Sequence, residues 1–493
     1  MPSVNELVSK RVGSTISNVK TWGDILINVK EEGATADGVT NDLTKLQTTF
    51  SGLQSGDRLY FPKGTYLLQG SGSLLTIPVN NVTIEGAGIE QTTIKVSAGA
   101  AQTFAFYALS KNQIVLKNMT IELSNDPGDY NLIGAYFDLC NEVAVENVKV
   151  RGWHKGGIRF HGCTQSDMIR CIADSIQDPY ATSESPTRKG LSIGASGSTR
   201  SSRCRILNSQ AFNCIAVNRM NGIGIADSDE ITLESNVLYS NDYGINVQNC
   251  NDVVCTDNQC SENKVIGIDF SNGCGRNVIS KNICKGNGND GIRHWGSTTV
   301  AATTSVISNN ICFDNGRTDA GSAGIRLSDQ SASFPSKNNI IAGNLCFDTR
   351  TGTSRTQEYG ILETVNSGFN QIKENHCFNN KTANESVVSK VNGYPMMDMG
   401  TSSVAPAAAV SQSVSITFKV PFASGTLPRI IPALQASDNS DGVQLLNIQA
   451  RNVTNTGANL IVATTDATNI DTKFTGGTGD TMIISWIAFG QLS

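Results

Sequence analysis

Short strands with alternating apolar and polar positions recur along the middle of the chain. Each opens with glycine followed by an aliphatic residue: Gly157-Ile-Arg-Phe, Gly190-Leu-Ser-Ile, Gly222-Ile-Gly-Ile, Gly244-Ile-Asn-Val, Gly267-Ile-Asp-Phe, Gly291-Ile-Arg-His, Gly324-Ile-Arg-Leu and Gly360-Ile-Leu-Glu. The intervals between these glycines are 33, 32, 22, 23, 24, 33 and 36 residues. A strand of period two has one buried and one outward side, so Ile268 and Phe270 are expected to point inward and Asp269 outward.

A second strand lies between these glycines and ends on asparagine, as in Ile231-Thr-Leu-Glu-Ser-Asn236 and Val278-Ile-Ser-Lys-Asn282. Asparagine tolerates left-handed backbone at a corner, and stacked asparagines can hydrogen-bond to one another. One such unit cannot bury its apolar side alone, whereas stacked units share a core. The sequence therefore predicts an all-β protein whose main domain is a right-handed parallel β-helix.

The longer intervals mark insertions, at Asp174 to Lys189, Gly296 to Ser305 and Asp348 to Glu358. Insertions in a repeat protein tend to gather on its binding face.

The pattern changes near the carboxyl end. Residues 383–412 are rich in Ala, Ser, Val and Pro and are expected to form a linker or irregular layer. Strict alternation follows in Val414-Ser-Ile-Thr-Phe418, and Met482-Ile-Ile-Ser-Trp486 is another apolar strand, so 413–493 is predicted to be a small antiparallel β-sandwich.

Composition excludes several classes of protein. The 493 residues are 39% hydrophobic and only 16% charged, with 47 glycines, which fits neither a disordered chain nor a helical bundle. A net charge of −5 gives no basic footprint for nucleic acid. No apolar stretch reaches the roughly 20 residues of a membrane span.

The amino terminus and the cysteines show neither a targeting signal nor a metal-binding motif. Residues 1–27 form a short segment without the apolar core of a signal peptide. The 13 cysteines lack the paired CxxC spacing of zinc sites, and five recur in register after asparagine, as in Asn282-Ile-Cys284. We interpret them as small buried apolar side chains and expect no metal and no cofactor.

The region after residue 27 carries a family resemblance. Gly33-Ala-Thr-Ala-Asp37-Gly38, with Asp42 and Gln47, resembles the opening of pectate-lyase-like β-helix proteins, a group that includes phage tailspikes and polysaccharide depolymerases. Tyr60-Phe-Pro62-Lys-Gly64 and Val82-Thr-Ile-Glu-Gly86 match it in order, so the β-helix is expected over 28–382. A helix with Leu43, Leu46 and Phe50 on one side would cap its open end, which makes Asp37 and Asp42 structural. The carboxyl-terminal strands are similar to H-type lectin-like modules of phage fibres.

Candidate chemistry lies on the outward side of the glycine strands. Counting each glycine as zero, the second following position is predicted to align Asn246, Asp269, Arg293 and Arg326 in one column, with Trp295 beside it. Arg159 and His161 form a second outward pair. A row of polar, charged and aromatic groups suits an oligosaccharide, so the six residues other than Asp269 are candidates for substrate binding.

Glycoside hydrolysis needs two carboxylates. Asp269 is the first candidate because it lies in mid-column, although a salt bridge to Arg293 is the competing interpretation. Its candidate partners are the neighbouring aspartates Asp227, Asp229, Asp242 and Asp290. Asp227 is two coils from Asp269, about 10 Å, which favours inversion.

Three functions stay open. The first is a homotrimeric phage tailspike that binds a bacterial capsular, exo- or cell-wall polysaccharide and hydrolyses it; the trimer, the attachment to a phage tail or baseplate protein and the virion location are implied by the resemblance. The second is a polysaccharide lyase that uses arginine and histidine residues. The third is an adhesin that only binds glycan. The polygalacturonase motifs are not reproduced.

Overall fold

The computed structural model describes residues 26–180, 188–217, 219–297, 300–329, 333–364, 367, 370–387, 396–404, 411–417, 429–435, 446–454, 456–464 and 482–490. Residues 1–25, which make up most of the expected amino-terminal segment, lie outside this set. The chain divides into two compact units, of which the first covers 1–368 with 373–388 and the second covers 369–372 with 389–493.

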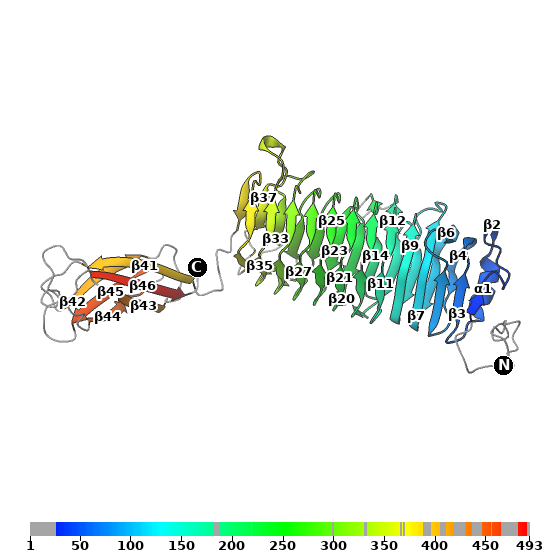
Figure 1. Ribbon diagram of the computed structural model, residues 1–493, viewed down its shortest axis with the longest axis horizontal. Helices are drawn as coiled ribbons and strands as arrows, with labels where there is room; N and C mark the ends of the chain where they lie inside the picture. Colours follow the sequence, from blue (N-terminus) through cyan, green and yellow to red (C-terminus); the bar gives the residue numbers. More distant parts are fainter. Residues whose placement is uncertain are drawn as a thin grey trace, which may run out of the picture. The chain divides into compact units, whose positions relative to one another are not determined.

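The first unit is a parallel β-helix built from three stacks of strands (Figure 1). The first stack holds the glycine strands: β2 (Asp37–Asn41), β4 (Gly64–Thr76), β6 (Thr92–Leu109), β8 (Leu132–Asp138), β10 (Gly156–His161), β14 (Lys189–Gly194), β19 (Asn221–Ala226), β23 (Tyr243–Gln248), β26 (Ile268–Ser271), β29 (Ile292–Gly296), β33 (Ala323–Asp329), β37 (Tyr359–Glu363) and β40 (Ala383–Ser386).

The second and third stacks complete each coil. The second holds β1 (Leu26–Asn28), β3 (Arg58–Phe61), β5 (Val82–Gly86), β7 (Asn112–Leu123), β9 (Asn141–Arg151), β11 (Asp167–Ile169), β16 (Arg205–Leu207), β21 (Thr232–Glu234), β24 (Val254–Thr256), β27 (Val278–Ser280), β31 (Val306–Ser308), β35 (Ile340–Ala342) and β38 (Gln371–Lys373). The third starts from β9 and continues with β12 (Ile172–Asp174), β17 (Gln210–Phe212), β22 (Val237–Tyr239), β25 (Gln259–Ser261), β28 (Ile283–Lys285), β32 (Ile311–Phe313), β36 (Leu345–Phe347) and β39 (His376–Phe378).

Three short strand pairs lie at the corners. They are β13 (Gln177–Asp178) with β18 (Ile215–Ala216), β15 (Ser201–Ser202) with β20 (Ser228–Asp229), and β30 (Ala302–Thr303) with β34 (Ser336–Lys337).

Inward columns form the core, as the alternation predicts. Ile268 pairs in register with Ile245 on one side and Ile292 on the other, and all three are fully buried. Cys284 continues a column of cysteines through β25, β28, β32, β36 and β39. Twelve of the 13 cysteines are buried as free thiols and Cys377 is half-buried, which confirms their interpretation as small core side chains.

Stacked asparagines bind the corners together. Asn282 lies in a ladder in which each amide donates to the next, with Asn258 Nδ2 at 3.0 Å from Asn282 Oδ1 and Asn282 Nδ2 at 3.0 Å from Asn310 Oδ1. These side chains are buried, so the ladder satisfies amides that would be costly to leave unpaired. The residue before each ladder asparagine takes a left-handed conformation, as at Lys281 (φ +56°).

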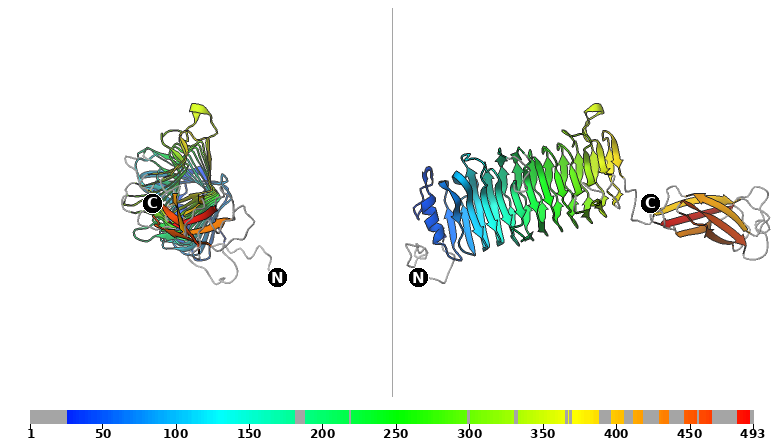
Figure 2. Two further views of the ribbon diagram at one scale, coloured as in Figure 1. Left: turned by 90° about the vertical axis from the view of Figure 1, so that its left-hand side faces the viewer. Right: turned by 180° about the vertical axis from the view of Figure 1, so that it is seen from behind.

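Helix α1 (Leu43–Ser51) lies at the amino-terminal end of the coils (Figure 2), with Leu46 and Phe50 buried. Asp42 occupies the N-cap position without capping the helix by its side chain. Its carboxylate instead accepts Thr35 N at 2.7 Å and Ala36 N at 3.0 Å, which is a structural role.

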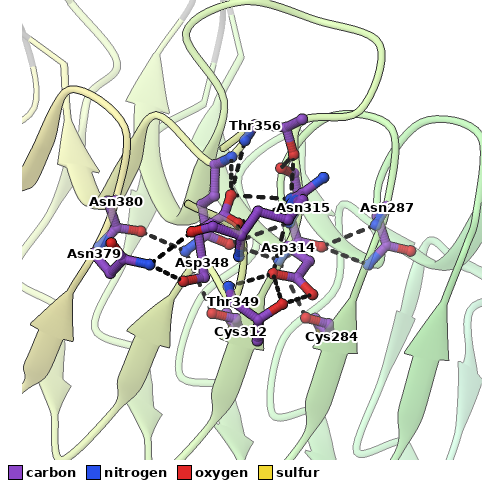
Figure 3. Close-up of polar contacts among 12 residues, drawn as sticks. Cys284, Asn287, Cys312, Asp314, Asn315, Asp348, Thr349, Thr356, Asn379 and Asn380 are labelled. Carbon is purple, nitrogen blue, oxygen red and sulfur yellow. Dashed lines mark hydrogen bonds and ion pairs between the residues drawn. The ribbon is translucent and has the colours of Figure 1, made fainter. Parts of the chain in front are cut away.

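The insertion between β36 and β37, which contains the short helix η2 (Gly352–Ser354), projects beside β37 (Figure 1). Asp348 anchors its base by accepting Thr356 N at 2.8 Å and Gln357 N at 2.9 Å. A second asparagine ladder runs through Asn287 and Asn315, with Asn287 Nδ2 at 2.9 Å from Asn315 Oδ1. Figure 3 shows how the anchor meets it: Thr356 Oγ1 donates to the backbone oxygen of Asn315 at 2.6 Å.

The second unit consists of two three-stranded antiparallel sheets. One is ordered β41 (Met396–Val404), β46 (Met482–Gly490), β43 (Arg429–Gln435), and the other β42 (Ser411–Thr417), β45 (Gly457–Thr464), β44 (Leu446–Arg451). The expected linker over 383–412 is wrong, because β40 and β41 lie within it and β42 begins there. Among the described helices, none is long and apolar enough to cross a membrane.

Candidate functional site

The outward column of the first stack is in the register that the glycine repeat predicts. Asn246 pairs with Asp269, Asp269 with Arg293, and Arg293 with Arg326. The column continues toward the amino terminus through Gly224, Ser192, Arg159, Tyr136 and Tyr107.

Asp269 is held in a dense polar network rather than exposed on an open surface. Its carboxylate accepts hydrogen bonds from Asn246 Nδ2 at 2.9 Å, Arg293 Nε at 2.8 Å and Trp295 Nε1 at 3.1 Å. A second contact from Arg293 Nη2 at 3.2 Å makes the ion pair bidentate. Asp269 thus takes its predicted place in the outward column, but these neighbours cover the carboxylate and leave the residue only 2% exposed.

The same holds for two of its candidate partners. Asp242 accepts Ala216 N at 2.9 Å and Met220 N at 2.8 Å, and burial raises its pKa. Asp290 accepts Ala323 N at 2.8 Å and pairs with Arg326 Nε at 2.9 Å. Both are buried, and both hold backbone of an adjacent coil.

The other two aspartates lie beyond the end of the glycine strand. Asp227 is an exposed corner residue with φ +48°, and it accepts Asn249 Nδ2 at 2.6 Å. Asp229 forms a bidentate pair with Arg200, at 2.6 and 3.0 Å. The structure therefore places neither of them in the outward column with Asp269.

A second group of titratable side chains surrounds Arg159. The guanidinium Cζ lies 5.9 Å from the ring centre of Tyr136, and the rings of Tyr136 and His161 meet edge to face at 5.4 Å. His161 pairs in register with Asp138 of β8 and Gly194 of β14. Asp138 Oδ1 is buried and has no hydrogen-bond partner among the described residues.

Lys189 completes this group. A Cβ atom at Gly224 would lie 2.3 Å from Cδ of Lys189. The aliphatic part of the lysine side chain therefore occupies the space over Gly224, where the outward column has no side chain. Among the described residues, no carboxylate forms an ion pair with its ammonium, although Lys189 is buried. We call Tyr136, Asp138, Arg159, His161 and Lys189 the basic cluster.

Burial and mutual repulsion shift the pKa values of the basic cluster. Burial, reinforced by Arg159, lowers the pKa of Lys189 to about 8. Burial and the positive charges of Arg159 and Lys189 lower the pKa of His161 to about 2, which keeps the imidazole neutral. Burial lowers the pKa of Arg159 to about 10 and raises that of Tyr136 to about 12. Shifted pKa values of this kind make the basic cluster a candidate functional site.

His294, in contrast, belongs to the core. It is fully buried between Ser305 Oγ and Ser336 Oγ, each 3.1 Å away, and burial lowers its pKa to about 4. The inward position predicted from the alternation is confirmed.

The sequence interpretation missed Lys189, Tyr136 and Asp138. Gly134-Ala-Tyr136-Phe-Asp138 fits the glycine-strand template with alanine in place of isoleucine, and this signal could have identified both residues. Lys189 precedes its glycine, so only the fold brings its side chain across Gly224.

Two family descriptions match the chain. "Rhamnogalacturonase A/epimerase, pectate lyase-like" matches residues 26–269, and "Periplasmic copper-binding protein (NosD)" matches residues 191–401. The residues do not fit a copper site, because no group of three or more His, Cys, Asp or Glu side chains within the described ranges could hold a metal ion, and burial raises the thiol pKa of core cysteines such as Cys274.

Two curated relatives are mannuronan C5-epimerases of Azotobacter vinelandii. AlgE6 is 26% identical over 162 residues, which are 29% of this chain and 18% of that protein. AlgE1 is 29% identical over 161 residues, which are 29% of this chain and 11% of that protein. The chain thus matches less than a fifth of the length of either relative.

Solved structures share the fold over more of the chain. The AlgE4 A-module of Azotobacter vinelandii has TM-score 0.60 at 17% identity and covers 74% of this chain and 98% of its own. The Dettilon tailspike protein (gp208) has TM-score 0.62 at 14% identity and covers 94% of both chains. PfbA, a surface adhesin of Streptococcus pneumoniae, has TM-score 0.53 at 14% identity over 75% of this chain and 96% of its own. This chain therefore has the pectate-lyase-like parallel β-helix fold that is found in tailspikes and mannuronan epimerases.

Proposed function

We propose that the protein acts on an acidic polysaccharide of the bacterial surface, and that the basic cluster binds a uronate unit. The observation that carries this proposal is the Lys189 ammonium, which is buried without a carboxylate partner among the described residues. An isolated buried charge is costly, and a bound carboxylate would supply the missing partner. Arg159 lies beside it and adds a second positive charge.

The same cluster supports removal of the proton next to the uronate carboxylate. Pairing the carboxylate with Lys189 and Arg159 would make this C5 proton more acidic, because the negative charge that develops is stabilised. His161 is neutral and can accept the proton, and a bound anion would raise its pKa. Tyr136 is protonated and can donate. In elimination the C5–H electrons form the C4=C5 bond, and the departing C4 oxygen takes a proton from Tyr136.

Hydrolysis by paired carboxylates, with Asp269 as the first residue, is the second candidate. It fits less well because Asp269 and Asp290 are bound in ion pairs and Asp242 holds two backbone amides. The lyase alternative places the uronate carboxylate beside Lys189, whose ammonium forms no ion pair with a carboxylate among the described residues.

For the whole protein we propose a tailspike-type role, as a homotrimer attached to a phage tail and acting outside the cell. Its support is the fold shared with the Dettilon tailspike over 94% of the chain. Light scattering of the purified chain would test the assembly, with three times 52.4 kDa expected and a monomer contradicting it.

A depolymerisation assay tests the chemistry. The purified protein is incubated with acidic and neutral polysaccharides from a panel of bacteria, and new reducing ends and near-ultraviolet absorbance are measured in the same samples. We expect absorbing, unsaturated ends from an acidic polymer, with activity lost in Lys189→Met and His161→Gln. New ends without absorbance, lost in Asp269→Asn, would establish hydrolysis instead. Binding without new ends would leave an adhesin or an epimerase, and proton exchange at C5 separates these two.

A further inference from the structure

Trp295 is an oriented aromatic side chain of β29, next to the outward column and several coils away from the basic cluster. Its indole Nε1 donates to Asp269 Oδ1 at 3.1 Å, and the guanidinium Cζ of Arg293 lies 4.8 Å from its ring centre. Asp269 and Arg293 are themselves joined in a bidentate ion pair. The ring is half-buried and fixed before any ligand arrives, so a sugar could stack on it without the cost of ordering the side chain.

The separation of Trp295 from the basic cluster can be measured along the stack of strands. Five register steps lead from Arg159 to Arg293, through β14, β19, β23 and β26. At about 4.8 Å a step this is about 24 Å. One step is close to the length of a pyranose unit in an extended chain, so a polysaccharide parallel to the stack would place about one sugar on each coil.

In their described part, the coils between these two points present mostly small or polar side chains in the two outward columns, with Asp269 as the last residue of the Arg159 column before Arg293. In the column of Arg159 they present Ser192, Gly224 and Asn246. In the column of His161 they present Gly194, Ala226, Gln248 and Ser271. Lys189 crosses at Gly224. These two columns therefore form a strip of small, polar and charged residues between Tyr107 and Tyr136 at one end and Trp295 at the other.

We propose that Trp295 forms a distal sugar-binding subsite that stacks on the polysaccharide about five units from the uronate held by the basic cluster. This inference rests on the proposed function. It makes the protein selective for long chains, because only an oligosaccharide that spans both points gains the stacking contact. Asp269 is then a positioning residue that fixes the indole.

The test is the chain-length dependence of turnover. For Trp295→Ala we expect kcat/KM to fall about tenfold, or about 1.4 kcal/mol, on oligosaccharides of about eight units or more, through KM, and to stay unchanged on those of about four or fewer. Trp295→Phe keeps a ring and should restore most of the loss. Tyr239→Ala is the matched control, because Tyr239 is an exposed aromatic residue of the third stack that lies against Phe212.

Two results would overturn the subsite: an equal loss at every chain length, or no loss at any length. Failure of the proposed function looks different, since the wild-type protein would then turn over no acidic polymer. In that case the affinity for a bound polymer, measured by calorimetry for the wild type and Trp295→Ala, decides the subsite alone: a tenfold weaker affinity supports it and an equal affinity rejects it.

Discussion

At the scale of single residues, Lys189 lowers the stability of the fold, because its positive charge is buried. Its pKa is lowered to about 8 by burial and by Arg159, whereas in the unfolded chain it has the ordinary lysine value of 10.5. The unfolded chain therefore binds more protons between these two pH values, and stability rises with pH through that window. Below about pH 8 the cost of the buried charge is fully present.

Replacing Lys189 by methionine removes this cost and leaves the stem that crosses Gly224. We expect Lys189→Met to be more stable than the wild type at pH 7, by up to about 3 kcal/mol, and to lose the rise in stability between pH 8 and 10.5. Denaturant unfolding across this pH range measures both effects. Lys285→Met is the control, because Lys285 is exposed. A variant that is less stable than the wild type at pH 7 would contradict the account of the buried charge.

His161 gives a spectroscopic prediction. Since burial and nearby positive charges lower its pKa to about 2, its ring stays neutral throughout the range in which ordinary histidines titrate. Nitrogen chemical shifts of the four histidines, assigned with His161→Gln, should show a neutral His161 from pH 8 down to pH 4. Adding an acidic oligosaccharide should raise its pKa. A titration midpoint near pH 6.5 in the free protein would contradict the burial and the positive charges that we describe around the His161 ring.

Whether the position of a single residue could be predicted from the sequence depends on where that residue lies in the repeat. The register of Asn246, Asp269 and Arg293 could be predicted, because period-two alternation and the glycine spacing define which positions share a column. Their burial could not, since it arises from contacts between side chains of different coils. Lys189 was missed for the same reason: its place above Gly224 depends on how two coils stack.

At the scale of elements, the asparagine ladder makes each coil depend on its neighbours. Asn282 accepts from the backbone and side chain of Asn258, and donates to Asn310 Oδ1 and to the Cys255 carbonyl at 2.9 Å. Removing its amide takes one hydrogen bond from each of four buried groups, although Asn258 Nδ2 still donates to Leu233 O and Asn310 Oδ1 still accepts from the backbone N of residue 282, both at 2.9 Å.

We therefore expect Asn282→Ala to lower the free energy of unfolding by about 1–3 kcal/mol, the cost of leaving a buried group such as the Asn258 backbone N–H unsatisfied. Asn375→Ala, at the half-buried end of the same ladder, should cost less than half as much because water can replace the lost contacts. Urea denaturation compares the two. Equal losses would mean that the ladder contributes little beyond local corner geometry.

The error in the predicted linker also belongs to this scale. Strand β40 pairs with β37 through the backbone, and Glu385 takes the register position of the buried Ile361. Its sequence, Ala-Asn-Glu-Ser, has no apolar alternation, so the pattern that identifies other strands is absent. A strand at the end of a stack can form on backbone hydrogen bonds alone, and sequence periodicity does not reveal it.

At the scale of the molecule, the β-helix provides a long, regular face, and our proposals place the chemistry and the recognition of the polymer on different coils of it. The basic cluster lies on β8, β10 and β14, and the oriented Trp295 lies on β29. Under these proposals the separation favours polymers that lie along the stack, while the buried Lys189 ammonium is the reason for proposing an acidic polysaccharide.

Proton exchange at C5 tests this account most directly. The protein is incubated in D2O with an acidic polysaccharide that it binds, and proton NMR follows the H5 signal of the uronate units. We predict that H5 disappears, through deuterium exchange or through formation of unsaturated ends, and that Lys189→Met abolishes this loss. Cleavage with H5 fully retained, or turnover of neutral polysaccharides alone, would contradict uronate chemistry at the basic cluster.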